Sequence, residues 1–511
     1  MEIADVLVIG SGAAATITLI ELFTKLVNEP SSHPKLNITI VEKHHEFWKG
    51  IPYGSRSSVN SLTITAISDF ISSGKEKDLF FTWLTENFDS WSAYYRSVGG
   101  LAAETWLEEN RPLIEKSDWA AIYLPRFVFG IYMQSKMLGL LKQVQESGLA
   151  NITQIQAEAI GVKYTGGEYY AVELEYPDRS TTTANTKKMV VAIGSAPVKK
   201  NAGQHNNDNY VYINDLYQPA LDDNLQTLKQ AFATTPDPQN RNLLIIGSNA
   251  SCIELMYLLD HRPDLLELTN QIVTISQTGI MPYHISDTRY DVYPCQNLDH
   301  VKATGGYDIH TLIEATKKDL APAVQQGVIV PYVDRVIGYT LELMQPLDED
   351  SKKLFFGVYG PHLTRLIRRS GPAYKAAANS LIAKQKLHLL KGSFLNLEPG
   401  ENGALLNYLD QDGHQKTDER PFKVIINCSG ANELHDSSSR LIRSLVEQNL
   451  CHVNLSGKGF LVNESFEAAP NLYIMGPLLG GNMNKRIHFW HLENVARLLY
   501  LAPYLAEHLL S

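Results

Sequence analysis

The feature that most constrains this chain is a glycine-rich bend near its first residue. Residues 6–9 form an apolar run that predicts a buried strand, Gly10-Ser11-Gly12-Ala13-Ala14-Ala15 fits the pattern G-x-G-x-x-A, and residues 16–27 have the apolar spacing of a helix. A second apolar run at residues 38–41 ends on the acidic Glu42. Strand, glycine bend, helix, strand and acid in this order are typical of a dinucleotide-binding fold.

Each residue type in this bend suits the binding of a diphosphate. Gly10 permits the tight turn, Gly12 lets the backbone approach the pyrophosphate, and Ala15 lets the helix pack against the strand. The helix start at Ala13 presents free N–H groups and the positive end of the helix dipole, and Glu42 can accept hydrogen bonds from a ribose. A bend this near the start of the chain is typical of FAD-binding proteins. The alternative is an accidental glycine turn.

A second bend follows the apolar run at residues 242–246. Gly247 begins it, Asn249 stands where a second glycine is usual, and Ser251 lies at the start of a helical pattern. Asparagine tolerates left-handed backbone geometry, but its side chain crowds a phosphate. The next strand ends in Ser276-Gln277-Thr278-Gly279, without an arginine to hold a 2′-phosphate. We expect a nicotinamide site here with NADPH and NADH both open, and a plain strand–helix turn is the alternative.

The composition excludes several classes of protein. Lys and Arg number 45 against 55 Asp and Glu, a net charge of −10 with no basic block, which argues against a nucleic-acid-binding protein. The 4 cysteines form no C-x-x-C pair, which argues against a disulfide reductase and suits a reducing compartment. No uninterrupted apolar run is long enough to cross a membrane. We therefore expect a cytoplasmic protein without a signal peptide or a membrane partner.

Three more apolar runs end on glycine, at Gly194, Gly430 and Gly476. Together with these runs, shorter motifs occur along the chain in a fixed order: Gly50-Ile51-Pro52-Tyr53-Gly54, Val59-Asn60, Pro125-Arg126 with Tyr132, and Gly476-Pro477-Leu478-Leu479-Gly480-Gly481. In this order the chain resembles, over nearly its whole length, the FAD/NAD(P)-binding oxidoreductases related to the flavin-dependent N-hydroxylating monooxygenases that act on lysine or ornithine. Asn249 and the segment 276–279, where that family has S-R-R-G, depart from the pattern.

The resemblance implies a set of cofactor-binding residues. For FAD they are Gly10, Gly12, Ala13, Ala15, Glu42, Lys43, Tyr53, Asn60, Arg126, Ala159, Gly194, Gly430, Gly476 and Pro477. For NADPH or NADH they are Gly247, Asn249 and Ser251.

The resemblance also implies an α/β fold with two dinucleotide-binding, Rossmann-like domains, of which the FAD domain is discontinuous and helices are inserted. We expect the first part of the FAD domain at residues 1–225, with a helical excursion at about 66–150. The NAD(P)-binding domain with a helical insert is expected at 241–420, and the FAD domain returns at 421–511 with a C-terminal helix.

The implied activity is that of an NAD(P)H-dependent monooxygenase, which hydroxylates an amine nitrogen of a small amino-acid-like substrate with O₂ through a C4a-(hydro)peroxyflavin. Asn482, Arg486 and His488 are the candidate catalytic residues, as donors at the expected start of the last helix. A solvated helix start is the alternative. His488 and His491 are expected on one helix face without a third ligand, so we predict no metal site. Residues 284–304 are the candidate lid.

Two other functions stay open. One is a flavin dehydrogenase or oxidase without stable oxygenation, which the altered second bend favours. The other is a non-catalytic protein that binds FAD and recognises a partner. The sequence leaves the substrate and a homo-oligomeric state open.

Overall fold

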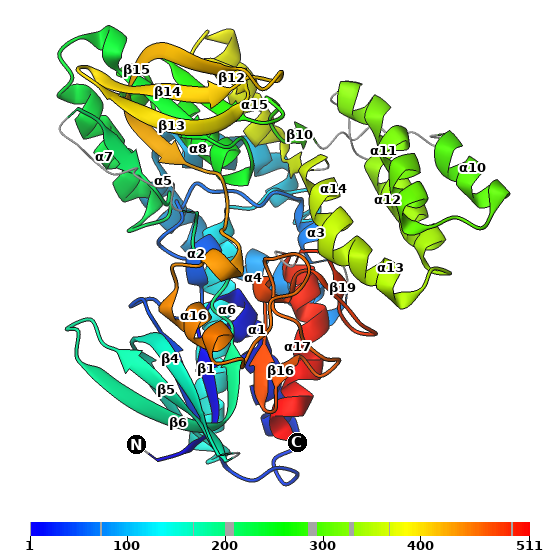
Figure 1. Ribbon diagram of the computed structural model, residues 1–511. Coiled ribbons are helices and arrows are strands. Elements are labelled where there is room, and N and C mark those ends of the chain that lie inside the picture. Colours follow the sequence, from blue (N-terminus) through cyan, green and yellow to red (C-terminus); the bar gives the residue numbers. More distant parts are fainter. Residues whose placement is uncertain are drawn as a thin grey trace.

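The computed structural model describes residues 2–71, 74–166, 168–199, 209–284, 294–326, 332–366, 368–491 and 494–511. These residues form two large mixed sheets and a group of helices inserted into the second. Figure 1 shows the first sheet at the bottom, the second at the top and the helical insert at the right. The expected α/β fold with two Rossmann-like units and helical insertions is confirmed.

The first sheet is built from strands at both ends of the chain. Its strands are β1 (Ala4–Ile9), β2 (Leu36–Glu42), β3 (Ala150–Gln156), β4 (Glu158–Thr165), β5 (Tyr169–Glu175), β6 (Thr181–Val191), β16 (Glu467–Ala469) and β17 (Leu472–Ile474). They lie in the order β16-β17-β6-β1-β2-β3, and the β4–β5 hairpin joins the first half of β6. In the parallel centre Val8 pairs with Ile40 and Val190, so the apolar runs lie side by side and fill the core.

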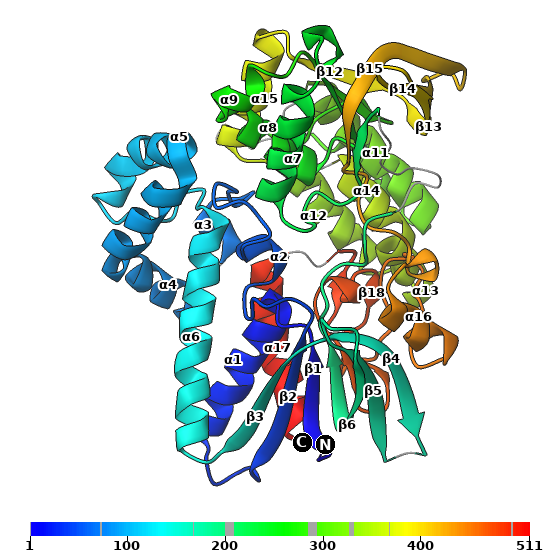
Figure 2. The ribbon, with the colours of Figure 1, turned by 90° about the vertical axis from the view of Figure 1, so that its left-hand side faces the viewer.

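Three helices pack together beside this sheet. In Figure 2, α1 (Ala13–Asn28) lies between α6 (Arg126–Glu146) and α17 (Val495–Leu510), and α1 contacts both. The excursion between β2 and β3 is helical, as expected, and contains α2 (Gly50–Tyr53), α3 (Ile67–Phe70), α4 (Lys75–Glu86) and α5 (Phe88–Ile114) as well as α6. The helix α5 breaks at Gly100, which has φ +59°.

The second sheet repeats the parallel arrangement and adds an antiparallel edge. Its strands are β7 (Val211–Ile213), β8 (Asn242–Ile246), β9 (Ile272–Ser276), β12 (Leu387–Lys391), β13 (Ser393–Gly400), β14 (Gly403–Leu409) and β15 (Gln415–Asn427), in the order β12-β9-β8-β15-β14-β13 with β7 beside the end of β15. Its helices are α7 (Leu221–Ala233), α8 (Ala250–Asp260), α9 (Pro263–Leu266) and α15 (Pro372–Ala383), and a 3₁₀ turn, η1 (Pro238–Asn240), precedes β8.

The helical insert, residues 294–366, has a core of its own. It contains α10 (Gln296–Thr304), α11 (Ile309–Gln326), α12 (Tyr332–Met344), α13 (Glu349–Leu354), the π-helical turn η2 (Phe355–Tyr359) and α14 (Gly360–Leu366), and the short parallel strands β10 (Tyr283–His284) and β11 (Arg369–Ser370) flank it. Trp490 connects the insert to the C-terminal part of the chain, because its ring packs 5.8 Å from Phe355 and 6.1 Å from Phe356.

The remaining elements lie between β15 and α17. They are η3 (Leu434–Asp436), α16 (Arg440–Glu447), η4 (Pro477–Leu479) and the two-stranded hairpin β18 (Asn482–Met483) and β19 (His488–Phe489). One continuous hydrophobic core contains side chains of β1, β6 and α1 together with side chains of β8, α8 and α15. The two sheets are therefore joined by buried apolar contacts.

The expected domain limits differ from the sheets at two places. Residues 211–213 pair with residues 424–426 in the second sheet, although 1–225 was expected in the FAD domain. The strand β15 stays in the second sheet as far as Asn427, beyond the expected limit of 420. Both differences arise because β15 is long enough to pair with β14 in its first half and β7 in its second.

Two other expectations concern single segments. Of the candidate lid, residues 285–293 lie outside the described residues, and 296–304 is the regular helix α10 rather than an irregular segment. None of the helices in the described part of the chain has both the length and the apolar character needed to cross a membrane.

Candidate functional site

The first glycine bend is held by backbone geometry that only glycine fits at its first position. Gly10 has φ +95°, and a Cβ there would lie 2.5 Å from the carbonyl oxygen of Ala192 at the end of β6. At Gly12 a Cβ would lie 3.5 Å from Cα of Gly50, an ordinary contact. The constraint from inside the protein therefore falls on Gly10, whereas Gly12 is limited only by what approaches from outside.

The start of α1 is open to an anion. Its N-cap is Gly12, which has no side chain that could bond to the first amides. The first turn holds no acidic residue. The first amides of a helix have no intrahelical acceptor, and they coincide with the positive end of the dipole. Ala13 and its neighbours thus offer unused N–H donors beside the bend, the arrangement that binds phosphate groups.

Glu42 lies directly against the bend. Its Oε2 accepts hydrogen bonds from the amide of Ser11 at 2.8 Å and from Ser11 Oγ at 2.9 Å, and its Oε1 accepts from the amide of His44 at 3.0 Å. Burial and the nearby Arg56 lower the pKa of His44 to about 4. His44 is therefore neutral near pH 7 and adds no positive charge near the carboxylate of Glu42.

The ends of β6 and β17 complete the same edge of the first sheet. The amide of Ala192 donates to the carbonyl of Ile9 at 2.8 Å, and the amide of Met475 donates to the carbonyl of Val191 at 3.0 Å. Gly476 has φ +90°, and a Cβ there would lie 3.0 Å from Cβ of Ala14. Gly476 and Pro477 therefore lie at the start of α1, although more than 450 residues separate them from it in the sequence.

Gly194 and Gly430 lie in the two segments that connect the sheets. Gly194 follows β6, where the chain leaves the first sheet, and Gly430 follows β15, where it leaves the second. Gly194 has φ +79° and Gly430 has φ +93°, and a Cβ at either would meet nothing within 4 Å. The amide of Lys199 donates to the carbonyl of Gly430 at 3.3 Å, so the outgoing and returning segments run together.

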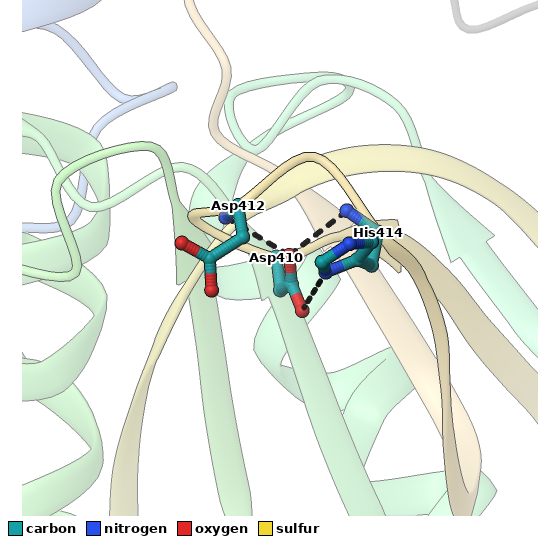
Figure 3. A group of neighbouring side chains, drawn as sticks. All are labelled: Asp410, Asp412 and His414. Atoms are coloured by element: carbon teal, nitrogen blue, oxygen red, sulfur yellow. Dashed lines mark hydrogen bonds and ion pairs between the residues drawn. The ribbon is translucent and has the colours of Figure 1, made fainter.

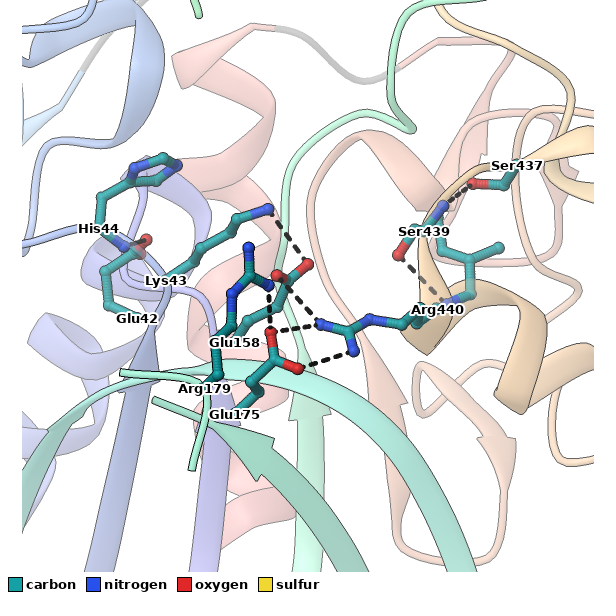
Figure 4. A network of polar contacts seen from close by, with 10 residues as sticks. Glu42, Lys43, His44, Glu158, Glu175, Arg179, Ser437, Ser439 and Arg440 are labelled. Carbon is teal, nitrogen blue, oxygen red and sulfur yellow. Dashed lines mark hydrogen bonds and ion pairs between the residues drawn. The ribbon is translucent and has the colours of Figure 1, made fainter. Parts of the chain in front are cut away.

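Lys43 belongs to a polar network at the open end of the first sheet, drawn in Figure 4. Its Nζ lies 3.1 Å from Glu158, which lies 3.6 Å from Arg440 at the start of α16. Arg440 donates two hydrogen bonds of 2.9 Å to Glu175, and with Arg179 it lowers the pKa of Glu175 to about 2. The network fastens α16 to the β4–β5 hairpin, and Lys43 contributes to it from β2.

The side chains of four other predicted FAD contacts are engaged within the protein. Tyr53 is buried against Phe70 and Phe129, and this burial raises its pKa. Asn60 donates to the carbonyl of Gly99 at 3.0 Å. Ala15 and Ala159 are buried in the core.

Arg126 forms a buried ion pair, one of the two roles open to it from the sequence, with a partner that the sequence did not indicate. Its guanidinium lies 2.6 Å from Glu254 of α8, with 15 % and 4 % of the two side chains exposed, and it donates to Ser57 Oγ at 2.8 Å. Glu254 also accepts from Ser61 at 2.6 Å and from Tyr217 at 3.1 Å. The only sequence signal for this pairing is an acid on the otherwise apolar helix 252–259. The network joins α6, beside the first sheet, to α8 of the second sheet.

The second bend begins with a glycine, as the first does, but its third residue is Asn249 where the first bend has Gly12. Gly247 has φ +103°, and a Cβ there would lie 2.4 Å from the carbonyl oxygen of Cys428. Asn249 is the exposed N-cap of α8 with φ −91°, so the left-handed geometry that asparagine tolerates is not used. Ser251 accepts a 3.4 Å hydrogen bond from Tyr217.

The three candidate catalytic residues lie on the β18–β19 hairpin and not at a helix start, because α17 begins only at Val495. Asn482 is buried, and its amide group bonds to the backbone of Phe460, Leu479 and Val462. Its hydrogen-bonding capacity is thus used to hold loops together.

The other two hairpin residues are less enclosed. Arg486 stacks 4.4 Å over the ring of Tyr504, and His488 is exposed on β19 beside Phe489. Partial desolvation of the His488 ring, together with the nearby Arg497, lowers its pKa. Because His488 lies on β19 and His491 precedes α17, the two histidines share no helix face.

Two features lie apart from the predicted site residues. Asp410, Asp412 and His414 gather in the turn between β14 and β15, shown in Figure 3, where Asp410 accepts from the amides of Asp412 at 3.0 Å and His414 at 2.9 Å. These bonds are those of an ordinary turn. A cavity of about 310 Å³ between α4, α5 and α6 is lined by Trp83, Asn87, Ser90, Trp91, Tyr94, Ile131 and Ser135.

Comparisons with known proteins agree with this arrangement. Residues 7–196 match a protein family described as FAD-NAD(P)-binding. The chain is 35 % identical, over 513 aligned positions that cover 99 % of it and 95 % of the relative, to an uncharacterized protein of Mycobacterium bovis, and equally to one of Mycobacterium tuberculosis.

Solved structures share the fold at low sequence identity. The FAD-bound cadaverine monooxygenase of the desferrioxamine pathway from Erwinia amylovora has a TM-score of 0.59 at 12 % identity, with 100 % of this chain and 95 % of that one covered. The ornithine N-hydroxylase of Kutzneria sp. 744 has a TM-score of 0.54 at 14 % identity, and L-lysine 6-monooxygenase of Pseudomonas syringae has 0.53 at 13 %, each with 99 % of both chains covered.

Proposed function

The chain belongs to the family of FAD-NAD(P)-binding oxidoreductases, together with its mycobacterial relatives, and on this premise we propose that it is an FAD-dependent monooxygenase. It would use NADPH or NADH and O₂ to hydroxylate an amine nitrogen of a small amino-acid-like substrate. In this proposal the first sheet binds FAD and the second binds the nicotinamide nucleotide.

The observation that carries the proposal is the cradle around the start of α1. Gly10 and Gly12 leave the bend without side chains, the first amides of α1 point outward, and the ends of β6 and β17 close the same edge. This donor set fits a pyrophosphate. Gly10, Gly12, Ala13, Gly476 and Pro477 would hold the FAD diphosphate and flavin border, and Glu42 would accept from the adenosine ribose.

FAD, when bound, supplies the transfer of a hydride equivalent from the nicotinamide and the reaction with O₂. The protein must then orient the two nucleotides and exclude water. The buried pair of Arg126 and Glu254 supports the first task, because it fixes α8 of the second sheet against α6 of the first. The packing of Trp490 on the helical insert supports the exclusion of water. It holds the helices of the insert against the β18–β19 hairpin, which follows Gly476 and Pro477 in the sequence.

The substrate class is supported by what the structural relatives act on. The three enzymes of known structure are named for cadaverine, ornithine and lysine, each of which carries a primary amine at the end of an unbranched chain. We propose a substrate of the same type.

One observation favours a second function. The exposed Asn249 stands at the N-cap of α8 where a glycine would admit the nucleotide diphosphate closely. A flavin dehydrogenase or oxidase without stable oxygenation would tolerate a less closely held nicotinamide.

The test begins with the colour of the purified protein and the identity of its extracted cofactor. The flavin is then titrated without oxygen with NADPH and with NADH, and turnover is followed in air with cadaverine, ornithine and lysine. Monooxygenation predicts about one hydroxylated amine per nicotinamide oxidised. Peroxide release without hydroxylated product from any amine would support the oxidase, and a protein that cannot be loaded with FAD would refute both.

A further inference from the structure

The two nucleotide bends are built alike, down to one side-chain contact. In each, a serine follows the first glycine and bonds to the last residue of the next strand. Ser11 bonds to the carboxylate of Glu42 at the end of β2. Ser248 Oγ lies 2.9 Å from the hydroxyl of Ser276 at the end of β9. The same position thus carries a negative charge in the first bend and none in the second.

This difference decides which ribose each bend accepts. In dinucleotide folds, the residue at the end of the second strand lies beside the adenosine ribose, and an acid there bonds to its hydroxyls. The same acid repels a phosphate on the 2′ oxygen. Ser276 is uncharged and offers a hydroxyl, so the second bend accepts a 2′-phosphate that the first would exclude.

A cation reaches the same place from the neighbouring strand. Lys391 is the last residue of β12 and pairs with Ser276 in the parallel register, and the amide of Gly392 donates to the carbonyl of Ser276 at 2.9 Å. A Cβ at Gly279 would lie 2.8 Å from Cβ of Lys391, so the segment after β9 lies directly on this lysine.

The ammonium of Lys391 is available for a ligand. The side chain is exposed. Among the described residues, its Nζ donates a hydrogen bond to an uncharged group, Oε1 of Gln411 at 3.2 Å. The neighbouring Asp410 has its carboxylate engaged by the amides of Asp412 and His414 and lies 3.8 Å from the His414 ring. Within the part of the chain that the structure describes, Lys391 Nζ therefore forms no ion pair with a carboxylate.

We propose that Lys391, with Ser276, recognises the 2′-phosphate of NADPH and sets the preference of this protein for NADPH over NADH. The lysine of β12 takes the place of the arginine that segment 276–279 lacks. The proposal rests on the proposed function only in placing a nicotinamide nucleotide on the second sheet.

The test measures binding and not turnover. The FAD-loaded protein is titrated calorimetrically with adenosine 2′,5′-bisphosphate and with adenosine 5′-monophosphate (AMP), which differ only in the 2′-phosphate and lack a nicotinamide. We expect the natural protein to bind the bisphosphate at least about tenfold more tightly than AMP, since a charge-assisted contact contributes on the order of 1.5–3 kcal/mol. Lys391→Gln should weaken bisphosphate binding about tenfold and leave AMP binding unchanged. Lys391→Arg should keep the preference, and Ser276→Asp should reverse it.

Lys384→Gln is the matched control, because Lys384 is an exposed lysine that directly follows α15, before β12 begins, and is paired with Asp260. It should change neither affinity. Equal affinity of the natural protein for the two ligands, or an equal loss for both in Lys391→Gln, would overturn the proposal. Selective binding in a protein that hydroxylates no amine would instead uphold it and count against the proposed function alone.

Discussion

Gly10 shows how a single residue type can be required by backbone alone. Its φ of +95° lies where side chains are disfavoured, and an added Cβ would lie 2.5 Å from the carbonyl of Ala192. We predict that Gly10→Ala lowers the free energy of unfolding by about 1–3 kcal/mol and reduces the flavin retained per protein chain. Thermal unfolding and the ratio of flavin to protein absorbance measure these two effects.

Gly139 provides the control for that substitution. It lies in α6, and a Cβ there would meet nothing within 4 Å. Gly139→Ala should therefore keep the flavin and gain about 0.5–1 kcal/mol in helix stability. A Gly10→Ala protein with natural stability and a full complement of flavin would show that the bend is not constrained as described.

At the scale of elements, Glu254 connects α8 of the second sheet to α6 beside the first. Removing one partner of a buried ion pair leaves the other charge without compensation. Glu254→Gln should lower the free energy of unfolding by about 3–5 kcal/mol, measured by urea denaturation. The exposed Glu104→Gln on α5 should change it by less than about 0.5 kcal/mol.

The paired substitution separates charge from packing. In Arg126→Gln/Glu254→Gln neither side chain is charged, so part of the lost stability should return. A double variant no more stable than Glu254→Gln alone would show that the hydrogen bonds from Ser61 and Tyr217 matter more than the ion pair.

Local sequence patterns predicted the elements well where one signal decided them. The apolar runs at residues 6–9, 243–246 and 189–193 each lead into a glycine, and β1, β8 and β6 of the structure end at or within these runs. The hairpin at 482–489 was expected as a helix start, because polar residues follow a glycine pair there as they do at many helix starts. What forms the hairpin is the pairing of Asn482 with Phe489 and the bonds of Asn482 to residues 460–462.

Partners distant in the sequence were the part that could not be predicted. The motif containing Arg126 indicated a role near the cofactor, but its position gives no sign that Glu254, more than 120 residues later, lies beside it. In the same way, β7 is too short to be assigned by its own residues and is placed by the second half of β15. Such contacts depend on how whole elements pack.

At the scale of the whole molecule, Trp490 is, with Met483, among the residues through which the C-terminal part of the chain packs on the helical insert. We predict that Trp490→Ala speeds limited proteolysis within residues 294–366 several-fold, because its packing on Phe355 and Phe356 is lost. Fragments identified by mass spectrometry would locate the cuts. Trp490→Phe should retain most of the protection.

Trp83→Ala is a control for aromatic truncation elsewhere. Trp83 packs on Phe80 and Tyr132, away from the insert. Its loss should destabilise α4 without exposing residues 294–366. Equal proteolysis of the insert in the Trp490 and Trp83 variants would mean that general destabilisation, and not detachment of the insert, is the cause.

The contribution of β17 and α17 to the first sheet has a consequence for biosynthesis. Gly476 lies at the start of α1, and Lys188 on β6 binds the last carbonyls of α17, those of His508 and Leu509. Both segments follow every strand of the second sheet in the sequence, and synthesis proceeds from the amino end. The growing polypeptide therefore completes its first sheet only after the second has been made, and capture of the flavin is a late step in folding.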